Sequence, residues 1–264
     1  EFLEHPDTIL DGIHACLKWL GIPKCLICIE DNKPAAIDLM QRKTEEDPGV
    51  GVCVLESSYP QGAQNILIHN ATGRTVPRGA RHTSVGVMML NVTTVSSIGK
   101  FLKTGMPLVN KRLTVAGDAV AHPKNLEVPI GTPIADVLAF CGTREEPRKV
   151  IVGGPMMGSA QMDVNYPITR QNNGLLAFGA KSAQRPNAES CIRCGRCINS
   201  CPVGLSPLDI RDAYLRYDTQ ALDKLMADLC IGCGMCSYVC PAKRPLTQMI
   251  KSMRKMVLAS RKKK

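Results

Sequence analysis

Two cysteine runs in the last third of the chain have the spacing of iron–sulphur ligands. Both runs read C-x2-C-x2-C-x3-C-P, and they cover residues 191–202 and 230–241. In this pattern three thiolates spaced two residues apart wrap one face of a cubane, while the fourth, beside a proline, reaches the other cluster. The spacing therefore predicts two [4Fe-4S] clusters with crossed ligand sets, which are Cys191, Cys194, Cys197 and Cys240 for one cluster and Cys230, Cys233, Cys236 and Cys201 for the second.

Structural zinc is the alternative for these runs, because zinc also binds C-x2-C pairs. A zinc site needs only four ligands. It gives no reason for the third cysteine of each run or for the C-P ending that both runs share. The runs therefore favour clusters, and we expect a protein that transfers electrons.

The other five cysteines lie in apolar segments, where a cysteine is most simply a small buried hydrophobic residue. Two of them, Cys25 and Cys28, form a C-x-x-C inside a strand pattern, which directs their side chains to opposite faces. Iron–sulphur ligation implies a reducing compartment, so we expect no disulfides. The five are Cys16, Cys25, Cys28, Cys53 and Cys141.

The chain is basic, with 33 Lys and Arg against 23 Asp and Glu and a formal charge of +10. Two clusters would lower this to about +6, since each 2+ core with four thiolates adds about −2. A basic balance suits nucleic acid, anionic membranes or acidic partners. Here part of it offsets the clusters, and we expect no nucleic-acid partner. Four basic residues lie in or just after the runs, where they favour a reduced cluster or are solvated surface charge: Arg193, Arg196, Lys243 and Arg244.

The 264 residues suffice for two or three domains. We find no apolar stretch as long as a membrane span and no secretory signal. The chain begins Glu1-Phe2 without a methionine, so we expect part of a longer protein.

Helix and strand patterns alternate through the first hundred residues, which predicts a parallel α/β sheet. The expected helices span 6–20, 33–46, 62–70 and 92–103, and the expected strands span 24–30, 50–55 and 85–90.

After the first hundred residues the secondary-structure pattern changes. Strand patterns at 112–115, 125–128 and 149–152 surround one helix at 133–141, which indicates a small β-rich module. Helices expected at 207–218 and 220–228 separate the cysteine runs and favour a helical two-cluster module. The expected domains are 1–106, 107–159, a linker at 160–187, and 188–264.

Four segments together resemble the C subunit of the Rnf electron transport complex (the RnfC family), which is similar to the flavin subunit of respiratory complex I. They are Tyr59-Pro-Gln-Gly62, the segment 150–158, Cys191-Ile-Arg-Cys194 and the segment 238–246. The resemblance covers nearly the whole chain. It implies an α/β plus α+β architecture, with an N-terminally incomplete Rossmann-like flavin/nicotinamide domain, a β-grasp (SLBB-like) module and a C-terminal ferredoxin-like domain.

The resemblance also implies a function. The chain would be an electron-transfer subunit of an ion-translocating ferredoxin:NAD oxidoreductase, exchanging electrons between NAD(H), FMN and other subunits. Ferredoxin would be an indirect partner through another subunit. The expected location is the cytoplasmic face of the cell membrane, as a peripheral subunit without a transmembrane segment.

By the same resemblance, Tyr59, Gly62, Asn91 and Thr94 are candidate flavin or nicotinamide contacts. Without it, each is an ordinary turn or cap residue, although a loop ending at a helix N-terminus does expose N–H groups to phosphate. Ala63 and Gln64 stand where the complex I protein has paired carboxylates, and the family's FMN-binding glycine loop would precede residue 1.

Three interpretations remain open from the sequence. The segment 153–158 fits a tight turn better than the alternative, a nucleotide-binding loop, whose motifs it does not match. The last helical stretch is either core-packed with a solvated tail or a basic amphipathic helix on an anionic membrane. The alternatives to the leading function are a flavin/iron–sulphur cobalamin reductase and a non-catalytic electron carrier.

Overall fold

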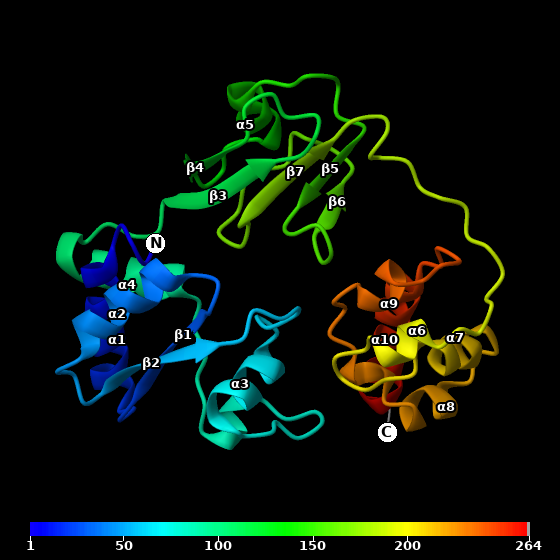
Figure 1. Cartoon of the computed structure of the whole chain (residues 1–264), viewed down its shortest axis with the longest axis horizontal. Coiled ribbons are helices and arrows are strands. Elements are labelled where there is room, and N and C mark those ends of the chain that lie inside the picture. The colour runs from blue at the N-terminus through cyan, green and yellow to red at the C-terminus, as the bar shows by residue number, and fades with distance from the viewer. Residues whose placement is uncertain (263–264) are drawn as a thin grey trace. The chain divides into compact units, whose positions relative to one another are not determined.

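The computed structural model describes residues 1–262, with side chains described throughout that range except at 255 and 259–262. The chain divides into two compact units, Glu1–Leu108 and Val109–Lys264. Figure 1 shows the course of the chain, and each unit is described by itself.

The first unit is built on a parallel pair of strands with helices between and after them. The two strands pair in register from Cys25↔Val50 to Glu30↔Leu55. Parallel strands require a crossover connection, which the helix between them supplies. The elements are α1 (Pro6–Leu20), β1 (Cys25–Glu30), α2 (Pro34–Thr44), β2 (Val50–Leu55), α3 (Gln64–Thr72) and α4 (Val92–Thr104).

Helices α1 and α4 pack closely because glycines lie at their contact. A Cβ atom on Gly12 would lie 2.0 Å from the Val95 carbonyl oxygen, and one on Gly99 would lie 2.1 Å from the Thr8 carbonyl oxygen. The buried side chains of this unit, Ile9, Ile13, Ile27, Ile29, Ala36, Met40, Val50 and Val95, form one core.

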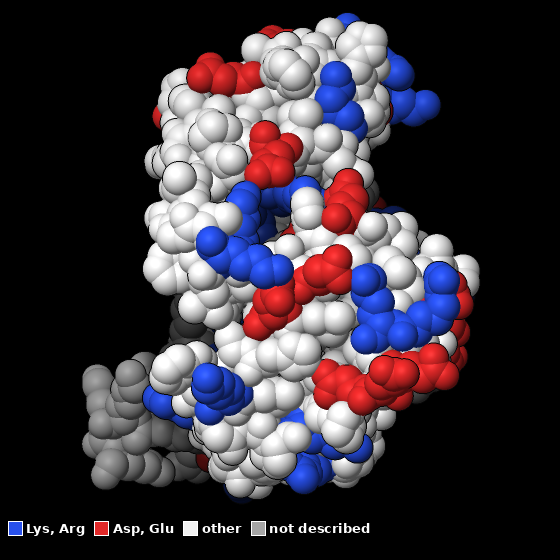
Figure 2. Space-filling model, turned by 90° about the vertical axis from the view of Figure 1, so that its left-hand side faces the viewer, with Lys and Arg blue, Asp and Glu red and all other residues white. Residues whose placement is uncertain are grey.

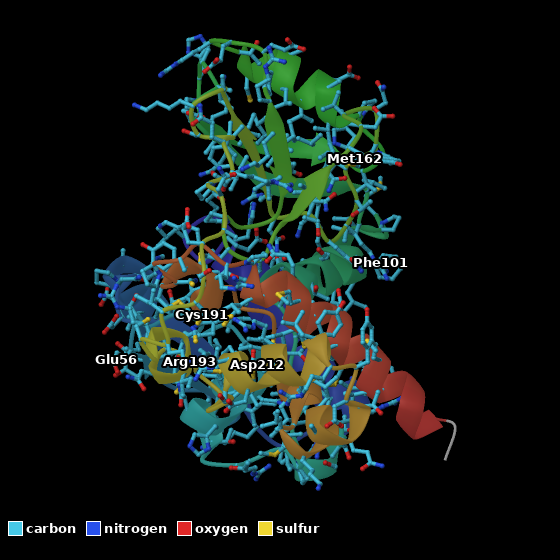
Figure 3. The ribbon with its side chains drawn as sticks, turned by 90° about the vertical axis from the view of Figure 1, so that its right-hand side faces the viewer. Glu56, Phe101, Met162, Cys191, Arg193 and Asp212 are labelled. Atoms are coloured by element: carbon cyan, nitrogen blue, oxygen red, sulfur yellow. The ribbon has the colours of Figure 1, made fainter. Side chains whose placement is uncertain are left out.

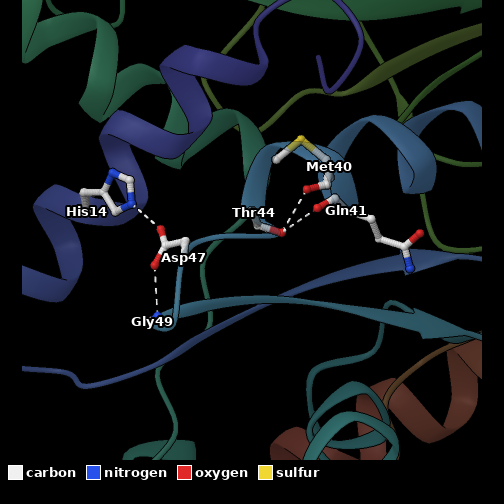
Figure 4. Close-up of polar contacts among 6 residues, drawn as sticks. All are labelled: His14, Met40, Gln41, Thr44, Asp47 and Gly49. Carbon is white, nitrogen blue, oxygen red and sulfur yellow. Dashed lines mark hydrogen bonds and ion pairs between the residues drawn. The ribbon is translucent and has the colours of Figure 1, made fainter.

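Polar contacts fix the connection from α2 to β2 (Figure 4). The Thr44 hydroxyl donates to the Met40 carbonyl at 2.9 Å. Asp47 accepts from the Gly49 amide at 2.9 Å and pairs with Nε2 of His14 at 2.7 Å. This pair gives His14 a structural role at the end of the strand pair.

The strand expected at 85–90 does not form. Residues His82–Val85 instead make a 3₁₀ turn, η1, which ends at Gly86 in the left-handed conformation with φ 69°. Side-chain exposure does alternate from Val87 to Leu90. In the described part of this unit the sheet has only β1 and β2, so the alternating segment has no strand to pair with.

The second unit begins with a five-stranded sheet in the order β4-β3-β7-β5-β6. Strands β3 and β7 are parallel, whereas β3–β4, β5–β6 and β5–β7 are antiparallel. Helix α5 contributes Ile134, Val137, Leu138 and Cys141 to the buried core of this sheet. The elements are β3 (Asn110–Ala116), β4 (Lys124–Pro129), α5 (Ile134–Cys141), β5 (Lys149–Val152), β6 (Ser159–Gln161) and β7 (Gly174–Phe178).

The prediction of a linker at 160–187 is wrong for the part that forms strand β7, Gly174–Phe178. Strand β7 lies at the centre of the sheet, and Leu175 and Ala177 on it are fully buried. The strand has only five residues and follows the polar turn around Asn172. A run this short shows no periodicity from which a strand could be predicted. Its place is set by pairing with β3 and β5 rather than by its own sequence.

The segment 153–158 forms the tight turn that the sequence predicts. Gly153 has φ 107°, and a Cβ on Gly158 would lie 2.5 Å from the Ile151 side chain. The turn joins β5 to β6, which pair antiparallel.

The rest of the second unit is helical, as expected. Its core contains Leu205, Ile210, Leu222, Ile250, Met253 and Val257 among others. Three of these lie on the last helix, which favours the core-packed interpretation, while the basic end at 261–264 lies outside the described side chains. The elements are α6 (Arg196–Asn199), α7 (Pro207–Leu215), α8 (Thr219–Lys224), η2 (Ala227–Leu229), α9 (Met235–Tyr238) and α10 (Leu246–Lys262).

Candidate functional site

Four cysteines from the two distant runs line one pocket in the helical part of the second unit. The pocket is small and partly open to solvent, and its cysteines are Cys191, Cys194, Cys197 and Cys240. Cys191, one of these four cysteines, is labelled in Figure 3. These four residues are the set that crossed ligation predicts for the first cluster.

Each run turns at a glycine that directly follows its second cysteine. Gly195 has φ 74° and Gly234 has φ 91°, a region that glycine enters at little cost. A four-residue helix, α6 or α9, then starts in each run and carries the third cysteine, Cys197 or Cys236. The sequence C-G-x-C is therefore the local cause of the fold of both runs.

The other four cysteines form a second, more buried group. Burial raises the pKa of Cys230, and the neighbouring thiols of Cys236, Cys233 and Cys201 raise it further against a backbone hydrogen bond that lowers it. The Leu205 amide donates to Cys201 Sγ at 3.3 Å, and the Gly232 amide donates to Cys230 Sγ at 3.4 Å. Cys236 Sγ lies 3.4 Å from the Thr247 hydroxyl.

These two groups fit clusters better than single metal ions. In the described part of the chain, no three His, Cys, Asp or Glu side chains are placed to hold one ion together. A zinc ion with Zn–S bonds of about 2.3 Å would need its sulphurs within roughly 4 Å of one another. A four-iron cluster spans more space and supplies its own bridging sulphides, and its cations stabilise thiolates that burial otherwise keeps protonated.

The two groups differ in exposure. Cys194 of the first group is exposed, whereas Cys233 and Cys236 of the second are each 8% exposed. Arg193 and Arg196, beside the first group, are also exposed, and the Ile192 side chain is 68% exposed. Arg193 is labelled in Figure 3. The first group is therefore the one nearer to solvent.

Two arginines also line the first pocket, and sequence reasoning found only one of them. Arg244 follows the second run, and its Nη1 donates to the Glu189 carbonyl at 2.9 Å. Arg211 comes from α7, where its Nη2 pairs with Asp212 at 2.6 Å. No spacing rule connects Arg211 with the cysteines, so only the fold reveals its place.

The candidate flavin contacts lie in the first unit, at the starts of α3 and α4. Tyr59 and Gly62 belong to the loop before α3, which begins at Gln64 rather than at Gly62 as expected. Asn91 caps α4 and accepts from the Thr93 amide at 3.0 Å. Thr94, in the first turn of α4, is exposed.

Gln61 is a residue of this loop that sequence reasoning missed. Its side chain is only 4% exposed, and its Oε1 accepts from Nδ2 of Asn70 at 2.9 Å. The Ser58 hydroxyl donates to the same oxygen at 3.4 Å. Gln61 therefore ties the loop that carries Tyr59 to helix α3.

The remaining five cysteines are less uniform than expected. Cys141 is buried in the sheet core of the second unit, but Cys16, Cys25, Cys28 and Cys53 are only half-buried. Cys28 lies opposite Cys53 in the β1–β2 register, whereas Cys25 lies opposite Val50. Cys25 and Cys28 both lie in strand β1, three residues apart, so the alternation of a strand directs their side chains to opposite faces.

Charges of both signs are interspersed over the face of the molecule in Figure 2. No helix among the described residues is long and apolar enough to cross a membrane.

Three domain families match the chain in succession. Residues 1–100 match the Nuo51 FMN-binding domain, residues 112–160 the SLBB domain, and residues 183–241 the 4Fe-4S dicluster domain. The order agrees with the architecture expected from the sequence.

Several curated proteins similar to this chain are C subunits of ion-translocating oxidoreductase complexes. The chain is 42% identical over 206 residues to the C subunit of the proton-translocating ferredoxin:NAD(+) oxidoreductase complex of Clostridium ljungdahlii, covering 78% of this chain and 45% of that protein. It is 39% identical over 258 residues to the C subunit of the Na(+)-translocating complex of Acetobacterium woodii, covering 97% of this chain and 58% of that protein. The C subunit of the ion-translocating oxidoreductase complex of Rhodobacter capsulatus is 35% identical over 212 residues, or 78% of this chain and 40% of that protein.

The chain thus spans about half the length of these relatives. Among solved structures, a chain of an NAD+-reducing [NiFe]-hydrogenase in the H2-reduced state has a similar fold, with a TM-score of 0.60 and 14% identity. That match covers 97% of this chain and 51% of the hydrogenase chain. The resemblance to the C subunit of the Rnf complex, stated from the sequence, is confirmed by the curated relatives.

Proposed function

The chain is a relative of the C subunits of ion-translocating ferredoxin:NAD(+) oxidoreductase complexes, and we propose that it carries electrons between a flavin and another subunit. The observation that carries this proposal is the gathering of Cys191, Cys194, Cys197 and Cys240 at one pocket, from two separate runs of the sequence. A single structural ion does not require such crossing.

We propose Cys191, Cys194, Cys197 and Cys240 as ligands of one [4Fe-4S] cluster, and Cys230, Cys233, Cys236 and Cys201 as ligands of the second. When bound, a flavin exchanges hydride with nicotinamide and releases single electrons, which [4Fe-4S] clusters carry one at a time. The protein holds the thiolates, limits water around the buried second group and supplies hydrogen bonds to its sulphurs.

Electron exchange with the partner protein takes place at the first cluster in this proposal. Its ligand Cys194 is exposed, and Ile192, Arg193 and Arg196 form an exposed apolar and basic surface beside it. An acidic surface on the partner would complement the two arginines and speed association. The second cluster, with Cys233 and Cys236 buried, passes electrons inside the protein.

The flavin end of the proposal uses the first unit. Tyr59 and Gly62 in one loop, with Asn91 and Thr94 at the start of α4, are the proposed flavin or nicotinamide contacts. Its match to the FMN-binding domain supports this assignment, as does the anchoring of the loop by Gln61. We also propose the finer fold names, a Rossmann-like first unit and a β-grasp topology for the sheet of the second.

The proposed partners are NAD(H) and the other subunits of a membrane-bound complex, with ferredoxin reached through one of those subunits. The proposed location is peripheral, on the cytoplasmic face of the membrane. The names of the relatives, which are subunits of ferredoxin:NAD(+) oxidoreductase complexes, support the proposed partners.

The test is a cofactor analysis of the full-length protein purified without oxygen. We expect about eight irons, matching acid-labile sulphide and one FMN per chain. The variants Cys201→Ala and Cys240→Ala should each keep about four irons and lose different electron paramagnetic resonance (EPR) signals. Zinc in place of iron would refute the proposal, and iron without flavin would favour the non-catalytic carrier.

A further inference from the structure

Two arginines at the first cysteine pocket each have a buried, unpartnered nitrogen. The Nε atoms of Arg211 and Arg244 are shielded from solvent, and within the described residues neither has a hydrogen-bond partner. Both side chains line the pocket formed by Cys191, Cys194, Cys197 and Cys240. Buried N–H groups are almost always paired in folded proteins, so a missing acceptor requires an explanation.

The guanidinium groups are anchored in a way that keeps these nitrogens from solvent. Arg211 is held by the 2.6 Å contact of its Nη2 with Asp212 Oδ1, and its side chain is 16% exposed. Arg244 is held by the 2.9 Å hydrogen bond from its Nη1 to the Glu189 carbonyl. Asp212 is labelled in Figure 3. Each contact uses a terminal nitrogen and leaves Nε without an acceptor.

Among the described residues that line the pocket, the only side-chain acceptors are sulphur atoms. Besides the four cysteines and two arginines, the wall is made of apolar side chains, which are Ile192, Leu208, Pro241, Ala242 and Leu246. A bound [4Fe-4S] cluster would bring thiolate and sulphide sulphurs, which accept hydrogen bonds from such N–H groups. The two unpaired N–H donors thus belong to side chains that line the pocket where a cluster would supply sulphur acceptors.

We propose that Arg211 and Arg244 donate Nε–H hydrogen bonds to sulphurs of the cluster held by Cys191, Cys194, Cys197 and Cys240, and thereby raise its reduction potential. Hydrogen bonds to sulphur and nearby positive charge both favour the more negative, reduced cluster. The inference rests on the proposed function, since it needs a cluster at this pocket.

The surroundings of the second cysteine group differ in kind. Its sulphurs receive backbone N–H bonds from Leu205 and Gly232. Two cationic side chains lie near it, Lys251, which packs against Gly232, and Arg254, which donates to the Cys230 carbonyl at 3.2 Å. Both are exposed, so solvent screens their charge more than it screens the half-buried Arg211. Because Arg211 and Arg244 line the first pocket, we expect them to act more strongly on the first cluster than on the second.

The experiment is an EPR-monitored redox titration of the full-length, oxygen-free protein, after iron and sulphide analysis has established two clusters in the wild type. The variants are Arg211→Gln and Arg244→Gln, with Arg211→Lys and Arg244→Lys to restore charge without the guanidinium. Arg216→Gln, at the exposed end of the same helix, is the matched control.

Each glutamine variant should lower the reduced-to-oxidised ratio of the first cluster about tenfold at a fixed potential, which is about 59 mV for a one-electron couple. The midpoint potentials of the lysine variants should fall between those of the wild type and the glutamine variants. Arg216→Gln should shift neither cluster, and in the glutamine variants the second cluster should shift less than the first. An unchanged midpoint in variants that keep the cluster would overturn the inference. So would loss of that cluster in all four variants, because the arginines would then be structural only. A wild type without iron would instead reject the proposed function.

Discussion

Cys28 and Cys53 lie opposite each other in the parallel strands β1 and β2. Burial raises the pKa of Cys28 to about 11, and the neighbouring Cys53 thiol adds to the shift. Because the thiolate is the reactive form, Cys28 should be alkylated roughly 100-fold more slowly at pH 8 in the folded protein than in the unfolded one. Site-specific mass spectrometry after iodoacetamide treatment measures this.

The same shift has a defined effect on stability. The folded pKa lies above the unfolded one, so the contribution is fully present below about pH 8.5 and is lost as pH rises toward 11. In Cys53→Ala the alkylation of Cys28 should begin at lower pH, but only modestly, because burial is the larger cause. Rapid alkylation of Cys28 at pH 8 in the native protein would contradict the assignment.

The ligand residues could be predicted from the sequence because their information is local. The spacing within each run and the C-G-x-C turn fix where three of every four thiolates lie. Arg211 could not be predicted in this way, since only the packing of α7 brings it to the pocket. The role of Gln61 could not be predicted for a similar reason, because its burial depends on a contact with Asn70 nine residues later.

At the scale of elements, the contact between α1 and α4 depends on two glycines. Alanine at Gly12 or Gly99 would place Cβ 2.0 or 2.1 Å from a backbone oxygen of the other helix. Alanine gains about 1 kcal/mol in helix propensity, but overpacking costs about 1–3 kcal/mol, and a backbone clash lies at the upper end. We therefore expect Gly12→Ala and Gly99→Ala each to lower the stability of the first unit by about 1–2 kcal/mol.

Denaturant unfolding followed by the fluorescence of Trp19, the single tryptophan of the chain and a residue of α1, measures this loss. Gly51→Ala is the matched control in the same unit, because its Cβ would lie 3.7 Å from the Leu26 side chain, an ordinary contact. Equal stability of all three variants would show that the helices can separate without cost.

Elements with strong periodicity were predictable, and elements defined by their neighbours were not. Helix α1 and strand β2 match their expected bounds, since the first has an apolar face and the second a continuous apolar run. The segment 85–90 alternates like a strand but has no partner in the described sheet. Strand β7 shows the reverse case, with little pattern and a central position.

At the scale of the molecule, the buried apolar side chains form three separate cores. One lies within residues 9–95, one within 113–177, and one within 205–257. No buried member is shared between the three cores in the described part of the chain. The first core lies inside its matched family segment, whereas the second and third overlap theirs and extend beyond residues 160 and 241. The separation of the cores leads us to expect that each can form without the others.

This separation predicts that residues 183–264 fold alone and retain both clusters. All eight proposed ligands and the whole third core lie in this fragment. The matched control is residues 183–241, which keeps every ligand but lacks α10 with its buried Ile250, Met253 and Val257. Burying three such side chains is worth about 5–9 kcal/mol, comparable with the entire stability of a small domain.

After anaerobic reconstitution, residues 183–264 should therefore hold about eight irons and unfold cooperatively, whereas residues 183–241 should hold few irons or aggregate. Iron analysis and circular dichroism of the two fragments measure the difference. Equal iron content in both would mean that ligation alone organises the cysteine runs. Failure of the longer fragment to fold would mean that the third core depends on the rest of the chain.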